Sequence, residues 1–178
     1  MISSENIKIK NSGFLFTGEP MTIDIMIRIR GFEVVEDKFR RFPNQEIMLP
    51  KRGTEKAMAY DFFSNETVEI KPGDQYLFMT DIRAYMLDRE CLIGNVRSSQ
   101  GLKKNLSFAN SQAWIDSDYY NSQDTGGNIG ICLYNYGDKP QVIERGERIA
   151  QFAFMPFLVA DNCNTENKRI GGFGSTGE

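Results

Sequence analysis

Hydrophobic and polar residues alternate with a period of two through much of the chain. In Ile23–Arg30, isoleucine occupies every second position, and the positions between hold Asp24, Met26 and two arginines. This alternation is typical of a β-strand with one apolar face. Similar short runs predict further strands at Glu46–Leu49, Thr67–Ile70, Gln75–Thr80, Ile82–Leu87, Cys91–Val96, Leu106–Asn110, Asn128–Tyr136, Gln141–Glu144 and Arg148–Phe157.

Turn-forming residues separate these predicted strands. Proline, glycine and aspartate mark the turns, which lie at Pro50–Gly53, Lys71–Asp74, Tyr136–Pro140 and Glu144–Glu147. Many short strands joined by such turns favour an antiparallel sandwich, a jelly roll or a barrel. A helix is predicted only at Ser98–Asn105, with Ser98 or Ser99 as its N-cap.

The amino-acid composition restricts the class of protein to which this chain can belong. A chain of 178 residues that is 40% hydrophobic and 25% charged has the size and balance of one globular domain. The net charge of −3 argues against non-specific nucleic-acid binding, which requires a basic surface. No apolar run reaches the roughly 18 residues of a membrane-spanning helix. We therefore expect a protein that binds neither nucleic acid nor membranes.

The numbers of histidines and cysteines restrict the catalytic mechanisms and metal sites that the chain can form. The sequence contains no histidine, so any general base must be a carboxylate, and Ser-His or Cys-His mechanisms are excluded. Three cysteines without a secretory signal argue against a disulfide framework and predict a cytoplasmic protein. Since no two of them form a Cys-x-x-Cys pair, they predict no metal site.

Two carboxylates stand out in the segment Ile115–Tyr119. Asp116 and Asp118 would share one face if this segment is extended, and one of them could act as a general base. Taken alone, a polar turn explains the segment better, because aspartate and serine are common in turns.

Three further polar segments have both a functional and a structural interpretation. Arg97 followed by two serines suits an anion at a helix start, or a simple N-cap. Gln151 could donate to a phosphate or lie on a sheet surface. Asp61 could hold a metal-bound water or complete a turn, and the turn is the better explanation in isolation.

The C-terminal segment Gly171–Gly177 is rich in glycine and hydroxyl groups. Successive N–H groups in such a segment can bind an anion, and Ser175, Thr176 and the nearby Arg169 add phosphate donors. Phe173 has no large neighbour in its own segment and could cover a nucleobase. The alternative is a frayed chain end.

These segments, in order, resemble the five motifs of the trimeric dUTP nucleotidohydrolases (dUTPases), in the form found in Gram-positive bacteria and their phages. The matching segments are Ala57–Asp61, Arg97–Asn105, Asn110–Tyr119, Gly146–Gln151 and Arg169–Gly177. The resemblance covers about Gly31 to Gly177. It implies an all-β jelly roll (β-clip) with at most one short helix, assembled as a homotrimer whose sites are each built from three chains.

The resemblance also implies a division of the chain. Residues 1–25 would be an N-terminal extension packed on the domain, and residues 26–160 the β domain. Residues 161–178 would be a mobile C-terminal arm that closes a neighbouring active site.

The activity implied is hydrolysis of dUTP to dUMP and pyrophosphate, which limits uracil in DNA and supplies dUMP for dTMP synthesis. Asp116 would activate the water that attacks the α-phosphorus. Tyr119 would lie against the deoxyribose and leave no room for a 2′-hydroxyl, and Asn110 would read the uracil edge.

The resemblance assigns the remaining substrate contacts to phosphate and base. Asp61 would lie near the water shell of Mg²⁺, which the triphosphate and waters would mostly hold. Phe173 would stack over uracil. The phosphate contacts would come from Arg97, Ser98, Ser99, Gln151, Arg169, Gly174, Ser175 and Thr176.

Two alternatives remain open on the sequence. A dCTP deaminase shares the fold and the Arg-Ser-Ser motif, but Cys132 stands before Leu133-Tyr134-Asn135 where that enzyme needs a glutamate. A phage protein of this fold could instead act mainly through protein contacts, such as repressor binding. The polar loop Asn121–Asn128 and the N-terminal residues are the candidate surfaces for such a regulatory partner.

Overall fold

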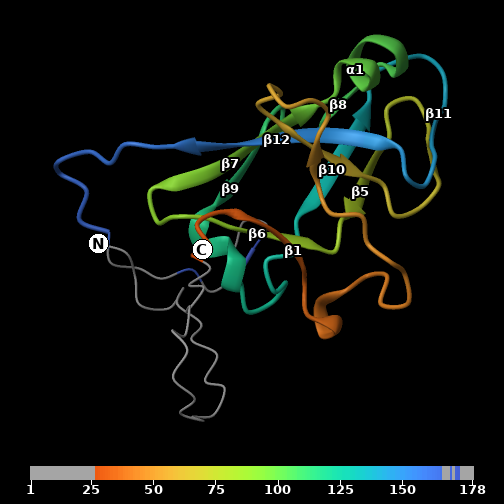
Figure 1. Cartoon of the computed structure of the whole chain (residues 1–178). Helices are drawn as coiled ribbons and strands as arrows, with labels where there is room; N and C mark the ends of the chain where they lie inside the picture. Colours follow the sequence, from red (N-terminus) through yellow and green to blue (C-terminus); the bar gives the residue numbers. More distant parts are fainter. Residues whose placement is uncertain (1–26, 166–168, 170, 173–178) are drawn as a thin grey trace.

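The computed structural model describes residues 27–165, 169, 171 and 172. All of the predicted N-terminal extension and more than half of the predicted C-terminal arm lie outside these residues. The described part is almost entirely β, with one α-helix (Figure 1). In chain order the elements are β1 (Gly31–Val34), η2 (Asp37–Phe39), β2 (Lys51–Arg52), β3 (Tyr60–Phe63), β4 (Val68–Ile70), β5 (Gln75–Met79), β6 (Ile82–Tyr85), β7 (Glu90–Val96), α1 (Ser98–Lys104), β8 (Leu106–Phe108), β9 (Ala113–Asp116), η3 (Ser117–Asn121), β10 (Gly130–Asn135), β11 (Gln141–Ile143) and β12 (Arg148–Pro156).

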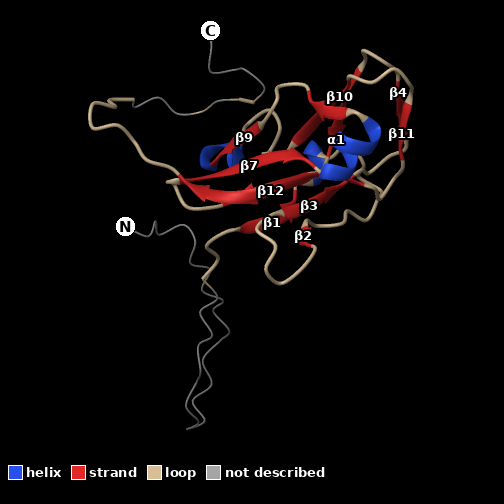
Figure 2. Cartoon of the chain, turned by 90° about the horizontal axis from the view of Figure 1, so that it is seen from above, coloured by secondary structure: helices blue, strands red, loops and turns tan. Residues whose placement is uncertain are grey.

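The largest sheet has five antiparallel strands in the order β2-β3-β12-β7-β9. Figure 2 shows β9, β7, β12 and β3 side by side, with α1 near one end of them. A second sheet has the order β5-β10-β8, and β1-β6 and β4-β11 form two-stranded ladders. This arrangement confirms the all-β fold class with a single short α-helix.

The core lies between the sheets and is rich in phenylalanine. Phe62 of β3 and Phe152 of β12 are fully buried, with ring centroids 4.7 Å apart. Gly94 of β7 makes room for the Phe152 ring, since a Cβ at this position would lie 2.1 Å from it. The inner faces of β5 and β10 add Phe78, Ile131 and Leu133.

Most of the predicted strands are confirmed, within a few residues at their ends. The prediction of a strand at Glu46–Leu49 is wrong, because only Ile47 turns into the core and none of the described strands pairs with this segment. In the predicted strand Ile23–Arg30, the residues from 27 on are irregular, the earlier ones lie outside the described residues, and β1 begins at Gly31.

Besides β1, three strands and one cap escaped the sequence patterns. β2 (Lys51–Arg52) lies where a turn was predicted, and β9 (Ala113–Asp116) overlaps the segment Ile115–Tyr119, for which a polar turn was the better explanation. Tyr60–Phe63 is a strand buried on both faces, so it lacks the alternation by which the others were recognised. The prediction of a serine N-cap is wrong, because α1 begins at Ser98 and its N-cap is Arg97.

Three residues of the motif segments differ in backbone conformation. Ala59 and Ala113 are not among the described non-glycine residues with positive φ, so alanine is unstrained there. Asn105 has a φ of 53° and caps the C-terminus of α1, a left-handed position that asparagine tolerates. Separately, no helix within the described residues is long and apolar enough to cross a membrane.

Candidate active site

The outward face of the five-stranded sheet carries three of the described site residues. Asp61 on β3 pairs with Gln151 on β12, and Gln151 pairs with Asn95 on β7. At the other end of β7, Cys91 pairs with Asp116 of β9. Directly paired residues point to the same face, and so do Cys91 and Asn95, which are four residues apart. Asp61, Gln151 and Asp116 therefore share one face.

Asp61 is buried between two arginines at one end of this face. Its side chain is only 4% exposed. One carboxylate oxygen accepts a hydrogen bond from Nη1 of Arg97, and the other lies 3.5 Å from Nη1 of Arg148. Because a buried carboxylate requires such partners, Asp61 fixes both guanidinium groups at the end of the sheet. Arg148 was not among the predicted site residues, although it lies within the fourth motif.

The short helix α1 follows Arg97 directly, and the side chain of Gln100 anchors it to Glu147 and Arg148. Gln100 is buried and donates to the carbonyl of Arg148, 2.9 Å away, and to Glu147, 2.8 Å away. These contacts fix the first turn, which leaves Ser98 and Ser99 exposed beside Arg97. The arginine, the two serines and Gln151 thus form a cluster of donors that suits an anion.

Asp116 and Asp118 lie at the opposite end of the face and share one arginine. Nη2 of Arg169 donates to Asp116, and its Nε donates to Oδ1 of Asp118 over 2.7 Å. The aspartate side chains are 59% and 57% exposed. Burial of the guanidinium lowers the pKa of Arg169, but its hydrogen bond and charge interactions with Asp118 and Asp116 outweigh this and raise the pKa above its ordinary value.

Tyr119 lies directly behind these carboxylates in η3. Its hydroxyl donates to the carbonyl of Asn128 over 2.9 Å and accepts from Oγ1 of Thr125 over 3.1 Å. Burial raises the pKa of the phenol. Gly172 lies against the ring, since a Cβ there would be 2.7 Å from it, and its N–H donates to Asp124.

Asn110 lies in the turn between β8 and β9. It is exposed and lines a pocket whose walls include Phe108, Ala113, Ile131 and Cys132. Ser111, next to it, has a φ of 66°, which produces the tight turn that presents Asn110. Apolar walls with an amide at the edge suit a flat polar ring such as a nucleobase.

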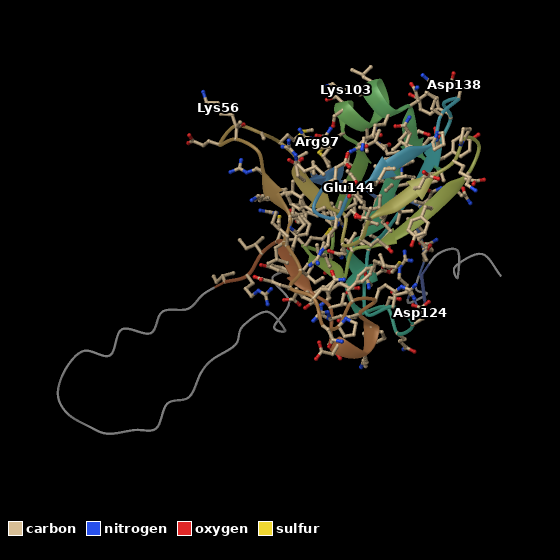
Figure 3. All side chains as sticks on the ribbon, turned by 90° about the vertical axis from the view of Figure 1, so that its right-hand side faces the viewer. Lys56, Arg97, Lys103, Asp124, Asp138 and Glu144 are labelled. Atoms are coloured by element: carbon tan, nitrogen blue, oxygen red, sulfur yellow. The ribbon has the colours of Figure 1, made fainter. Side chains whose placement is uncertain are left out.

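Within one chain the predicted site residues lie in two separated groups, one around Asp116 and one around Arg97. Along β7, the pairing positions of Asp116 and Gln151 are about 13 Å apart, and the two residues are also two strand spacings, about 10 Å, apart across the sheet. In Figure 3, Arg97 lies toward the helix that carries Lys103, whereas Asp124 lies at the other end of the molecule.

The strip between these groups is apolar. Trp114 of β9 pairs with Ile93, which in turn pairs with Ala153 of β12, and all three lie on the outward face. The Trp114 side chain is exposed, and a pocket beside the strip is lined by Met58, Ile93, Ala153 and Met155 together with Arg97 and Gln151.

Comparison with known proteins identifies the family. The dUTPase family model matches residues 45–177. A deoxyuridine 5′-triphosphate nucleotidohydrolase from Lactococcus lactis is 46% identical over 153 residues, which is 85% of this chain and 99% of that protein. The chain belongs to the dUTPase family. This confirms the resemblance of the five motifs and the expectation of an enzyme of the dUTP diphosphatase class.

Other dUTPases agree in sequence and in fold. The enzyme from Corynebacterium diphtheriae is 35% identical over 138 residues, covering 74% of this chain and 87% of its own. The crystal structure of the Streptococcus mutans dUTPase is 40% identical and superposes with a TM-score of 0.65 over 74% of this chain and 99% of its own. A dUTPase from phage phi11 of Staphylococcus aureus shares the fold, with a TM-score of 0.62 at 18% identity over 79% of this chain and 97% of its own.

Not all motif residues of this dUTPase lie within the described part. The phosphate and base contacts predicted from the end of the fifth motif, Phe173, Gly174, Ser175 and Thr176, lie outside the described residues, as do residues 1–25. Arg169 and Gly172 lie against Asp116, Asp118, Tyr119 and Asp124 of their own chain. Closure of a neighbouring site by the arm stays a prediction.

Proposed function

We propose that this chain hydrolyses dUTP to dUMP and pyrophosphate, with Asp116 as the general base. The observation that carries the proposal is the position of Asp116, an exposed carboxylate at the end of β9, three residues before Tyr119 and six residues after Asn110. In a chain without histidine, a positioned carboxylate is the base that the reaction requires, and such a base contributes about 10²- to 10⁴-fold in rate.

The reaction is an in-line substitution at the α-phosphorus. Asp116 accepts a proton from water while the water oxygen bonds to the α-phosphorus. The bond from this phosphorus to the oxygen that bridges it to the β-phosphorus breaks, and pyrophosphate leaves with that oxygen. Tyr119 packs against the deoxyribose and Asn110 pairs with the uracil edge, so a ribose or a cytosine fits poorly.

We propose that the complete site forms in a homotrimer. Two observations support this: the separation of Asp116 from Gln151 within one chain, and the exposed apolar strip around Trp114 that lies between them. Contact between copies over this strip would bury it and place the Asp116 group of one chain beside the Arg97 group of another. The arm that begins near Arg169 would then supply phosphate and base contacts from residues 173–176.

Mg²⁺ fits this site as a partner of the nucleotide. No cluster of three or more metal-ligating side chains occurs in the described part of the chain, and both oxygens of Asp61 already face arginines. We therefore propose that the triphosphate and waters hold most of the coordination sphere, with Asp61 reaching it through water at most. When bound, the ion neutralises charge on the phosphates.

In the cell this activity would limit uracil in DNA and supply dUMP for dTMP synthesis. We propose that it operates in the cytoplasm, where the nucleotide pool lies.

A pyrophosphate-release assay tests the proposal. The protein is incubated with Mg²⁺ and dUTP, UTP or dCTP, beside Asp116→Asn and Asp138→Asn variants. Asp138 is an exposed aspartate in the β10–β11 turn, outside the five motif segments, and serves as the matched control. We expect release from dUTP alone, lost in Asp116→Asn and kept in Asp138→Asn.

The same incubations separate the alternatives when ammonia is measured beside pyrophosphate. Ammonia release from dCTP would identify a deaminase, against the presence of Cys132 at the required glutamate position. No turnover of dUTP by an intact oligomer would contradict the enzyme proposal and favour a role through protein contacts.

A further inference from the structure

The loop Ser122–Asn128 is more buried than its polar sequence suggests. Ser122 and the three residues from Gly126 to Asn128 are buried, and only Gln123 and Asp124 are exposed within it. The loop therefore offers little surface to a protein partner. Two of its polar groups, the Thr125 hydroxyl and the Asn128 carbonyl, instead contact Tyr119.

Two groups of this loop hold the hydroxyl of Tyr119. Thr125 donates to the phenol oxygen over 3.1 Å, and the phenol donates to the carbonyl of Asn128 over 2.9 Å. A phenol has one proton to donate and readily accepts one hydrogen bond, so both of these functions are satisfied by the loop. The ring is thereby fixed at its far end as well as at its Cα.

Asn128 is itself held rigidly. Its side-chain oxygen accepts the N–H of Asp81 over 2.9 Å, and its amide nitrogen donates to the Asp81 carboxylate over 2.9 Å and to the carbonyl of Phe39 over 3.0 Å. Asp81 and Asn128 are 0% and 1% exposed. A fully satisfied buried network of this kind has one conformation, so the carbonyl that receives the Tyr119 hydroxyl has a fixed position.

The loop needs two glycines to reach this position. Gly126 and Gly127 have φ of 60° and 79°, values that side chains rarely allow. A Cβ on Gly126 would lie 2.1 Å from the Phe39 ring, and one on Gly127 would lie 2.6 Å from the carbonyl oxygen of Tyr120. The two glycines therefore let the loop pack closely against the Phe39 ring and the backbone of Tyr119 and Tyr120.

We propose that the loop Ser122–Asn128 sets sugar specificity, with Thr125 and Asn128 as positioning residues that hold the Tyr119 ring where it bars a 2′-hydroxyl. This rests on the proposed function, in which Tyr119 lies against the deoxyribose. A ring held at both ends cannot swing away from a ribose, whereas a ring held only at its Cα can. The loop thus fixes the orientation of the Tyr119 ring.

The test compares dUTP with UTP in three loop variants. Thr125→Val keeps the shape of the side chain but removes its hydroxyl, Thr125→Ser restores the hydroxyl, and Gln123→Ala is an exposed control in the same loop. We expect the ratio of kcat/KM for dUTP over UTP to fall about fivefold in Thr125→Val, the effect of one neutral hydrogen bond. The ratio should be kept in Thr125→Ser and in Gln123→Ala.

A double-mutant cycle separates positioning from general damage. In a Tyr119→Phe background the hydroxyl is absent, so Thr125→Val should have no further effect on the ratio. Equal losses for dUTP and UTP, or losses that add fully to those of Tyr119→Phe, would overturn the proposal.

The loop proposal can be tested even if the protein does not hydrolyse dUTP. If the wild-type protein does not turn over dUTP, the same ratio is measured from the binding of non-hydrolysable imido analogues of dUTP and UTP. A fivefold loss of selectivity in Thr125→Val still supports the loop proposal, whereas an unchanged ratio, or no binding of either analogue, overturns it.

Discussion

Arg169 forms an ion pair with Asp116, 53 residues earlier in the chain. The guanidinium contacts one oxygen of the carboxylate that we propose as the general base, and the Asp116 side chain stays 59% exposed. Because a neighbouring cation lowers the proton affinity of a carboxylate, Asp116 should be a stronger base once the arginine moves away. The triphosphate gives it a more highly charged partner to move to. Nucleotide binding and release of the base are thus expected to be one event.

Weakening the contact between Arg169 and Asp118 should make the chain near Arg169 more accessible to proteases. Asp118 accepts a 2.7 Å hydrogen bond from Arg169 but is more than half exposed, so this contact is expected to contribute less than about 1 kcal/mol. In Asp118→Asn, tryptic cleavage after Arg169 should accelerate up to about fivefold, the factor that this energy sets. Asp138→Asn should cleave at the wild-type rate, and equal rates in both variants would show that Asp118 does not hold the arm.

Removal of Mg²⁺ should stop turnover without unfolding the protein. The described residues contain no cluster of three or more metal-ligating side chains, so the ion is expected to arrive with the nucleotide. Calorimetry should detect no tight Mg²⁺ binding to the free protein and clear binding when a non-hydrolysable dUTP analogue is present. EDTA should abolish pyrophosphate release and leave the melting temperature unchanged. Tight binding to the free protein would point to a protein-held metal instead.

Stability should fall in acid, partly through Glu147. Burial raises the pKa of this carboxyl, but hydrogen bonds from Lys104 and Gln100 outweigh it and hold the pKa below the ordinary glutamate value. A carboxyl whose pKa is lowered in the folded state contributes stability above its unfolded pKa and loses it as pH falls through the folded pKa. Urea unfolding should therefore show a drop below about pH 4.5, the ordinary glutamate value. The drop should be shallower in Glu147→Gln than in the exposed control Glu69→Gln.

Two glycines should respond oppositely to alanine. A Cβ on Gly94 would lie 2.1 Å from the buried Phe152 ring, so Gly94→Ala should destabilise the protein by about 1–3 kcal/mol. Gly101 lies inside α1, where the nearest atom to a new Cβ is 3.8 Å away. Gly101→Ala should therefore stabilise by up to about 1 kcal/mol through helix propensity. Thermal unfolding measures both, and a stable Gly94→Ala would mean that the Phe152 ring shifts easily.

The strands that alternation predicted are those with one buried and one exposed face. Gln75–Met79 and Gly130–Asn135 show this pattern, because only one side of each strand packs into the core. Tyr60–Phe63 was missed because it is buried on both sides, and Glu46–Leu49 was wrongly predicted because an apolar spacing does not guarantee a partner strand. Local pattern reports the exposure of a strand and does not report its pairing.

The sequence by itself determined the family, the all-β class and the candidate base, since ordered motifs and the lack of histidine can be read directly from residue identities. Only the tertiary structure decided what those residues touch. Asp61 meets Arg97 and Arg148 across 36 and 87 residues, and the loop that closes on Tyr119 is held by Asp81, 47 residues before Asn128. Such contacts depend on how strands pair and loops close, which is a property of the whole chain and of no local segment.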